Sequence, residues 1–237
     1  MEKIELLYTQ ERQLEELEEA IAYRFKNKLL LIEALTHRSF THEHPFLELE
    51  NNQRLEFLGD AVLGLSIAHA AYEVEPLLPE GKMTRLRAAV VCEESLADIA
   101  IRIELADYLQ LGNGEIVDGG REKSSILADA MEAVFAAIYL DSGLKEAKAC
   151  ILRLMQAHLF LALNGKLTND YKSSLLEYAQ SQANQPQVLF SFIEKTGPAH
   201  KQAYVAEVRM GEFVANGQGS TKKQAEQEAA KRLLNML

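Results

Sequence analysis

An almost wholly apolar stretch that contains two acids is the feature that most constrains this chain. Residues 126–143, ILADAMEAVFAAIYLDSG, read as a helix with apolar side chains nearly all round, so this helix must lie inside a domain. Asp129 and Glu132 are three residues apart within it, and no Lys or Arg occurs between Ser124 and Lys145. Because a buried carboxylate needs a partner, the stretch predicts either charge pairing with another segment or a bound metal ion.

A second acidic pair occurs in residues 51–63, NNQRLEFLGDAVL, whose apolar residues follow a helical stripe. Glu56 and Asp60 are four residues apart and therefore lie on one face of that helix. Taken alone, such a pair is most often a solvated acidic face. Together with Asp129 and Glu132, it makes a set of four carboxylates from two helices. Oxygen ligands of this kind favour Mg²⁺ or Mn²⁺ over zinc, and the alternative is a group of buried structural acids.

These motifs resemble those of the ribonuclease III family. RLEFLGDAV, within residues 51–63, resembles the family signature, and residues 119–133, GGREKSSILADAMEA, resemble its second acidic motif. Residues 29–40, LLLIEALTHRSF, resemble the segment that precedes the signature. The resemblance covers nearly the whole chain in the family's order and spacing. It implies a divalent-metal-dependent endonuclease acting on double-stranded RNA, with catalytic and metal-binding carboxylates at Glu56, Asp60, Asp129 and Glu132.

The resemblance also assigns roles outside this set. Glu80 matches an accessory acid that faces the partner subunit's site, although a solvated turn residue would look the same. Phe57 matches an aromatic residue that inserts into the other subunit, which implies a homodimer, although a residue packed in the chain's own core would look the same. Gln53 stands where the family commonly has Glu, while His37 and Ser39 read as hydrogen-bonded structural residues. Three side chains before the second acidic pair either contact phosphate or pair within the chain: Asn113, Arg121 and Lys123.

The charge distribution bears on RNA binding. The net charge of −10 excludes binding through uniform positive charge, because RNA is an anion. Residues 1–165 carry 28 acidic and 16 basic side chains, whereas residues 166–237 carry 7 and 9. Local patches, mainly in the tail, therefore have to bind the nucleic acid.

Other features predict a cytoplasmic protein without a membrane partner. The N-terminus lacks an apolar signal region, and no apolar run reaches the ~18 residues needed to span a bilayer. Cys92 and Cys150 are far apart and read as core thiols rather than a disulfide or a metal site. The glycine-rich segment 111–120 is not followed by G-K-S/T, so no nucleotide cofactor is expected.

The pattern predicts two domains, an all-α endonuclease domain over residues 1–164 and a small α+β domain over residues 165–237. In the first we expect a surface helix over residues 1–25, single helices over 29–40, 83–103 and 144–163, and a loop over 111–120. The second has the order α-β-β-β-α, with Ser220 or Thr221 as the N-cap of the last helix.

This tail resembles the double-stranded-RNA-binding domain. In that domain the first helix, the loop after the first strand and the start of the last helix contact the duplex. The matching positions are Ser173, Glu177, Gln180, His200, Lys222 and Lys223. Glu226 stands where many such domains have a third Lys, and Leu176 stands where Gln is common, so we expect weaker RNA affinity than in a strongly basic module.

The function expected from these features is that of a dimeric Mg²⁺-dependent endoribonuclease that cuts both strands of RNA duplexes. The products would carry 5′-phosphates and 3′ overhangs, and the role would be RNA maturation, including ribosomal precursor RNA. The alternative is a catalytically inert protein of the same fold that holds structured RNA. The presence of all four acids favours the enzyme.

Overall fold

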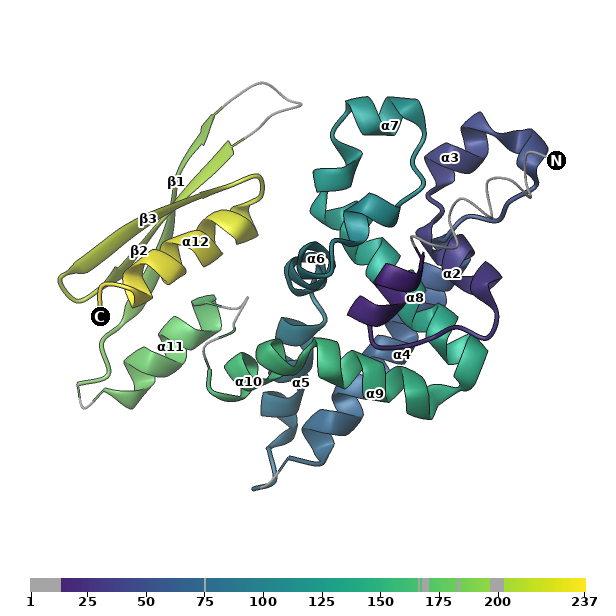
Figure 1. Ribbon diagram of the computed structural model, residues 1–237. Coiled ribbons are helices and arrows are strands. Elements are labelled where there is room, and N and C mark those ends of the chain that lie inside the picture. The colour runs from purple at the N-terminus through teal and green to yellow at the C-terminus, as the bar shows by residue number, and fades with distance from the viewer. Residues whose placement is uncertain (1–13, 75, 166, 168–170, 183, 197–202) are drawn as a thin grey trace. The chain divides into compact units, whose positions relative to one another are not determined.

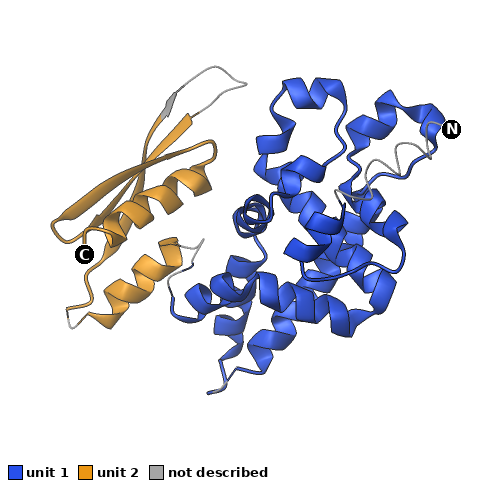
Figure 2. Cartoon of the chain, in the orientation of Figure 1, with its two compact units in different colours: residues 1–167 blue, residues 168–237 orange. Residues whose placement is uncertain are grey.

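The computed structural model describes residues 14–74, 76–165, 167, 171–182, 184–196 and 203–237. The chain divides into two compact units, residues 1–167 and residues 168–237 (Figure 2). The described part of the first unit is helical, and the second unit combines helices with a three-stranded sheet. The predicted order of an all-α domain followed by an α+β domain is therefore confirmed. Among the helices of the described residues, none is both long and apolar enough to cross a membrane.

The first unit is a bundle arranged around α8 (Figure 1). Residues 14–20 are helical, and the elements that follow have these bounds: α2 Lys28–Leu35, α3 Arg38–Glu43, η1 Pro45–Leu47, α4 Gln53–Tyr72, α5 Glu80–Val90, α6 Glu93–Arg102, η2 Leu105–Tyr108, α7 Asn113–Val117, η3 Gly120–Glu122, α8 Ser124–Ser142, α9 Leu144–Leu154 and α10 Gln156–Leu163. Helices α2, α4, α6 and α9 pack against α8. This arrangement explains why α8 is apolar nearly all round.

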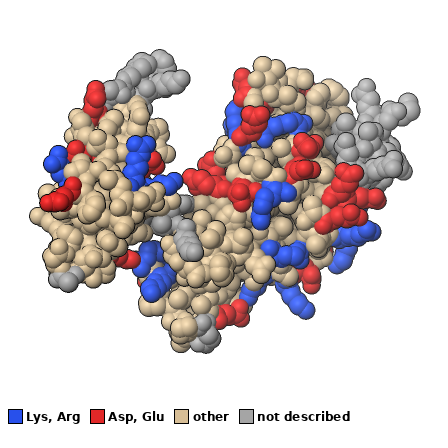
Figure 3. Space-filling model, turned by 60° about the vertical axis from the view of Figure 1, so that its left-hand side comes forward, with Lys and Arg blue, Asp and Glu red and all other residues tan. Residues whose placement is uncertain are grey.

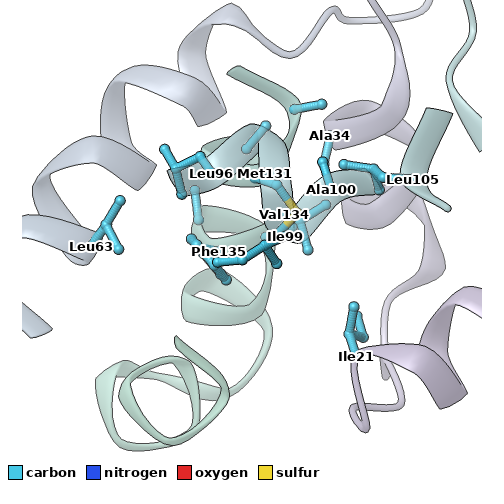
Figure 4. Close-up of a cluster of buried hydrophobic side chains, with 14 of the residues drawn as sticks. Ile21, Ala34, Leu63, Leu96, Ile99, Ala100, Leu105, Met131, Val134 and Phe135 are labelled. Atoms are coloured by element: carbon cyan, nitrogen blue, oxygen red, sulfur yellow. The ribbon is translucent and has the colours of Figure 1, made fainter. Parts of the chain in front are cut away.

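The core of the first unit confirms that the second acidic motif lies on a buried helix. Met131, Val134 and Phe135 of α8 have no solvent exposure. Figure 4 shows them beside residues of α2, α4 and α6, including Ala34, Leu63, Leu96 and Ile99. Apolar burial on all sides of α8 fixes its rotation, so Asp129 and Glu132 occupy set positions relative to α4.

The helix expected over residues 1–25 has the apolar stripe of a surface helix in its described part, but it ends at residue 20 and buries one of its acids. Leu14, Leu17 and Ile21 are buried in the same core as α8. Glu18 is only 3% exposed, and its carboxylate accepts a hydrogen bond from the Phe25 amide and forms an ion pair with Lys28. A charged residue beside an apolar stripe looked solvent-facing in the sequence because its partners lie beyond the helix.

The helix predicted over residues 29–40 is broken into α2 and α3. The break occurs where Thr36 forms a parallel bridge with Gln110. The Gln110 amide donates to the Leu35 carbonyl, and the Gln110 carbonyl accepts from the His37 amide. A tertiary contact therefore supplies the backbone hydrogen bonds that a continuous helix would otherwise provide.

Three other expected elements also differ from the structure. The helix expected over residues 83–103 ends at Val90 and restarts at Glu93, where Ser95 and Cys92 donate side-chain hydrogen bonds to the freed Ala89 carbonyl. The helix expected over 144–163 is divided at Met155, which is completely buried. The expected loop 111–120 contains α7, whose N-terminus is held by α3 through a contact described below.

The second unit contains α11 Tyr171–Ser181, β1 Val188–Thr196, β2 Ala203–Met210, β3 Phe213–Gly219 and α12 Lys222–Leu234. The strands form an antiparallel sheet in the order β1-β2-β3, and α11 and α12 contact it (Figure 1). Its core includes Leu175 and Val208, and Thr221 is the N-cap of α12, accepting from the Gln224 amide. The predicted α-β-β-β-α order is confirmed.

Candidate active site and RNA-binding surface

The two acidic motifs meet where α4 and α8 are in backbone contact. A Cβ atom built on Gly59 would lie 1.9 Å from the carbonyl oxygen of Glu132, so only glycine fits this position of α4. Glu56 and Asp60 flank Gly59 in the sequence, and Asp129 precedes Glu132 by one turn of α8. The glycine that interrupts the signature helix therefore brings the two pairs of acids together.

Electrostatic interactions link the acids at this junction. Burial, followed by the charges of Asp60, Asp129 and Glu56, raises the pKa of Glu132 to about 8. Burial, followed by the charge of Asp129, also raises the pKa of Glu56. These shifts mean that the folded chain holds the carboxylates against their mutual repulsion.

Two charged residues at this site escaped prediction because they are remote in the sequence. The positive charge of Arg38, on α3, acts against the rise in the pKa of both Glu56 and Asp129. Burial raises the pKa of Asp129, and Glu93, the first residue of α6, raises it further. Arg38 lies in the segment that resembles the family's T-H-x-S motif, which was the one available sequence signal.

The four acids offer only carboxylate oxygens to a divalent cation. In the described residues, no three carboxylate, imidazole or thiol groups converge closely enough to hold an ion as they stand. Glu56, Asp129 and Glu132 are half-buried and Asp60 is exposed, so the carboxylates have room to rotate. All ligands would be hard oxygens, and a cation would relieve the repulsion that raises the pKa of Glu132. The chemistry of the residues therefore fits Mg²⁺ or Mn²⁺.

Other positions on α4 and α5 lie outside this set. Glu80 begins α5, is exposed, and accepts a hydrogen bond from the Thr84 hydroxyl at 2.8 Å. Its charge is not among those that raise the pKa of Glu56, Asp129 and Glu132 in the same chain. Gln53 is the exposed first residue of α4. Phe57 is 82% exposed, although it lies between Glu56 and Gly59.

The segment before α8 is held by α3. His37 Nδ1 accepts from the Ser39 amide and lies 2.8 Å from the Ser39 hydroxyl, which accepts from the Gly112 amide. The Glu43 carboxylate accepts from the amides of Asn113 and Gly114 at the start of α7 and from the Asn113 side chain. Glu43 was not predicted, because its partners are about seventy residues away in the sequence.

The two cations of this segment also have internal partners. Arg121 donates to the Ala106 carbonyl, and Lys123 forms an ion pair with Glu115. With Asn113 bound to Glu43, each of the three side chains for which phosphate contact was one alternative makes a contact within the chain. These contacts position the loop that leads into α8.

In the second unit, α11 places Ser173, Glu177 and Gln180 on one face at helical spacing, opposite the buried Leu175 and Ala179. Lys222 and Lys223 are the exposed first two residues of α12. His200 lies outside the described residues.

Positive charge is limited on this surface. Glu226 is one helical turn beyond Lys222, and its carboxylate forms an ion pair with Lys172 of α11 at 2.7 Å. On the face of each unit seen in Figure 3, basic and acidic side chains are interspersed. Few unpaired lysines are therefore available to an RNA backbone near the start of α12.

Comparison with known families and proteins agrees with both units. Residues 27–159 match the family model described as Ribonuclease-III-like, and residues 171–237 match the double-stranded RNA binding motif. The protein named Ribonuclease 3 from Caldanaerobacter subterraneus subsp. tengcongensis is 45% identical over 222 residues, which cover 93% of this chain and 96% of that protein. Ribonuclease 3 from Oceanobacillus iheyensis is 45% identical over 225 residues, with 93% and 96% covered.

The solved structures agree with the sequence relatives. The nuclease domain of Ribonuclease III from Campylobacter jejuni, in a structure described by flexibility in a region involved in dimer formation, is 44% identical, with a TM-score of 0.57. The match covers 61% of this chain and 97% of that one. The chain therefore belongs to the ribonuclease III family of double-stranded-RNA endonucleases and carries a double-stranded RNA binding motif after its nuclease domain.

Proposed function

We propose that this protein hydrolyses phosphodiester bonds of RNA duplexes at the junction of α4 and α8, with a divalent cation held by Glu56, Asp60, Asp129 and Glu132. Mg²⁺ is the proposed ion, and Mn²⁺ is a substitute with the same preference for oxygen. The observation that carries the proposal is the pKa of Glu132, which burial and the other three acids raise to about 8. A bound cation would stabilise the ionised form of this acid more than that of an acid with an ordinary pKa.

The roles of the chain's own groups follow from this arrangement. When bound, the cation supplies Lewis acidity at the phosphate and lowers the pKa of water. The four carboxylates would hold it, and Glu132 would have to be ionised to serve as a ligand, since metal ligands must be deprotonated. Arg38, on α3, adds positive charge close to Glu56 and Asp129. This charge favours the approach of a phosphate backbone to the site.

The proposed active form is a homodimer. Phe57, Leu65 and Tyr72 of α4 are 82%, 54% and 71% exposed, and their spacing places them on one side of the helix. A stripe of large apolar side chains beside the acids fits a two-fold contact between copies of α4. Each subunit would then cut one strand, which gives 5′-phosphates and 3′ overhangs. Glu80 is proposed as the accessory acid that approaches the other subunit's site.

The second unit is proposed to bind the duplex through Ser173, Glu177, Gln180, His200, Lys222 and Lys223. The resemblance to the family supports a role in maturation of ribosomal precursor and messenger RNA. Cys92 and Cys150 are free thiols, which supports the cytoplasm as the compartment.

Incubation of the full chain with a long RNA duplex, with and without Mg²⁺, tests this proposal. We expect cleavage only with Mg²⁺ and fragments with 5′-phosphates and 3′ overhangs when their ends are analysed. A single-stranded RNA of the same sequence is the matched control and should remain intact. Binding of the duplex without cleavage under either condition would contradict the proposal and support the inert RNA-binding alternative.

A further inference from the structure

The two lysines at the start of α12 differ in what holds them. The Lys222 ammonium lies over the ring of Phe192, 4.8 Å from its centroid. Lys223 is the next residue and is also exposed, but within the described residues it has no ring or carboxylate partner. One of two adjacent cations is therefore oriented by an aromatic ring, and the other is free to move.

The sheet presents this ring to the helix. The register of β1 against β2 shifts between Phe192 and Glu194, and a bulge of this kind turns the strand and redirects its side chains. Phe192 also contacts Tyr204 of β2, with ring centroids 5.8 Å apart. On the neighbouring strand, a Cβ atom on Gly219 would lie 2.5 Å from the Cβ of Gln224, so β3 brings the start of α12 close to this end of the sheet.

A ring and a carboxylate have different effects on a lysine. Lys172 lies over the Phe190 ring, but its ammonium also forms a 2.7 Å ion pair with Glu226, which neutralises its charge. Phe192 restricts Lys222 without supplying a negative charge, and the ring covers only one side of the ammonium. The full positive charge and the remaining N–H donors of Lys222 stay available to an anion.

We propose that Phe192 is a positioning residue for duplex RNA binding, because its ring holds the Lys222 ammonium in place to contact a backbone phosphate. A lysine loses considerable rotamer freedom when it is immobilised, and a partner that restricts it before binding reduces that loss. This matters in a module where Glu226 occupies the position of a third lysine and withdraws Lys172. The inference rests on the proposed duplex binding through Lys222.

A double-mutant cycle on the full chain tests the inference, with affinity for an RNA duplex measured in EDTA so that no cleavage occurs. Phe192→Leu should weaken binding about two- to fivefold, the size expected of an exposed cation–π contact. Phe192 is 46% exposed, so leucine leaves the core filled, and Phe192→Tyr should restore the affinity. In the Lys222→Ala background, Phe192→Leu should have no further effect.

Lys223→Ala provides the matched control, since it removes the same charge one residue away. In that background, Phe192→Leu should weaken binding by the same factor as in the wild type. Equal effects in both lysine backgrounds would show that Phe192 acts only through the fold and would overturn the inference. If Lys222→Ala leaves the affinity for the duplex unchanged, Lys222 does not contact RNA. That result would contradict the proposed RNA-binding surface and, with it, the role of Phe192.

Ring fluorination separates the electrostatic contact from packing. Successive fluorine substitution at residue 192 reduces the negative charge of the ring face while nearly preserving its shape, so affinity should fall step by step. An affinity that is constant across the series would overturn the inference even if Phe192→Leu binds weakly.

Discussion

Gly59 and Glu132 are in backbone contact, since a Cβ atom on the glycine would lie 1.9 Å from the glutamate carbonyl oxygen. This contact sets the distance between the two helices that carry the acids. It also explains why a glycine occupies the interior of α4, where it costs about 1 kcal/mol relative to alanine.

Gly59→Ala should therefore destabilise the nuclease unit by more than about 2 kcal/mol, because the helices must separate to admit a methyl group. Urea unfolding of the full chain, followed by a probe in the helical unit, measures this. Gly81→Ala is the control, since a Cβ atom on Gly81 would have no neighbour within 4 Å. A loss of stability in Gly81→Ala equal to that in Gly59→Ala would contradict the close-contact explanation.

The raised pKa of Glu132 predicts a specific pH dependence of stability without metal. The folded pKa is about 8 and the ordinary value is 4.5, so between these values the folded state binds more protons than the unfolded state. Stability in EDTA should fall as pH rises through that range, with no penalty below it and the full penalty above it. Glu132→Gln removes the charge, so it should melt higher than wild type, by about 2–6 °C near pH 8.

Thermal melts of both proteins across this pH range test the prediction. Mg²⁺ should narrow or reverse the difference, because it binds the folded wild type more tightly. Glu19→Gln, an exposed acid of the N-terminal helix, is the control and should show no such trend. A variant that melts below wild type in EDTA would show that internal partners stabilise the acids, contrary to a self-repelling cluster.

The ion pair between Glu226 and Lys172 predicts that removing the acid strengthens RNA binding. Glu226→Gln should release the Lys172 charge and increase affinity for all duplexes by a similar factor. If Lys172 then reaches a phosphate, the salt dependence of binding should steepen by about 0.9. Glu228→Gln is the control, because it frees Arg232, which lies on another face of α12. It should change neither the affinity nor its salt dependence. Equal changes in both variants would indicate a general charge effect.

The exposure of Phe57 predicts that Phe57→Ala weakens the dimer while the monomer stays folded. The loss should be about 1–3 kcal/mol if the ring fills a pocket on the other subunit. Analytical ultracentrifugation at micromolar concentration measures it, and circular dichroism reports the fold. Leu29→Ala removes an apolar side chain of α2 that is 60% exposed and should leave the dimer intact. A monomeric wild type at that concentration would contradict the two-strand cutting scheme.

The sequence was sufficient to predict the parts of the fold that depend on local pattern. The apolar residues of α8 identify a buried helix, and the alternation in β1 and β2 identifies strands. The breaks at Thr36, Val91 and Met155 could not be predicted in this way, because no glycine or proline marks them. The break at Thr36 depends on a tertiary contact, the bridge with Gln110.

In the candidate site, too, some residues can be predicted from the sequence and others only from the packed structure. Its four acids are recognisable from their spacing and from the family resemblance. Arg38 and Glu93 act on the pKa of Asp129 from α3 and α6, and only the packed structure brings them there. Glu43 and Phe192 likewise contact partners that are remote in the sequence.

We propose that the acids at the junction of α4 and α8 carry out cleavage, while the second unit provides affinity for the RNA duplex. Comparison of wild type and Glu132→Ala with the same duplex, for cleavage in Mg²⁺ and for binding in EDTA, tests it most directly. Glu132→Ala should lose cleavage by more than about 100-fold, since even outer-shell partners of metals contribute 10- to 100-fold, and should keep its affinity for the duplex. Cleavage by Glu132→Ala at close to the wild-type rate would show that the acids of this junction are not the catalytic site.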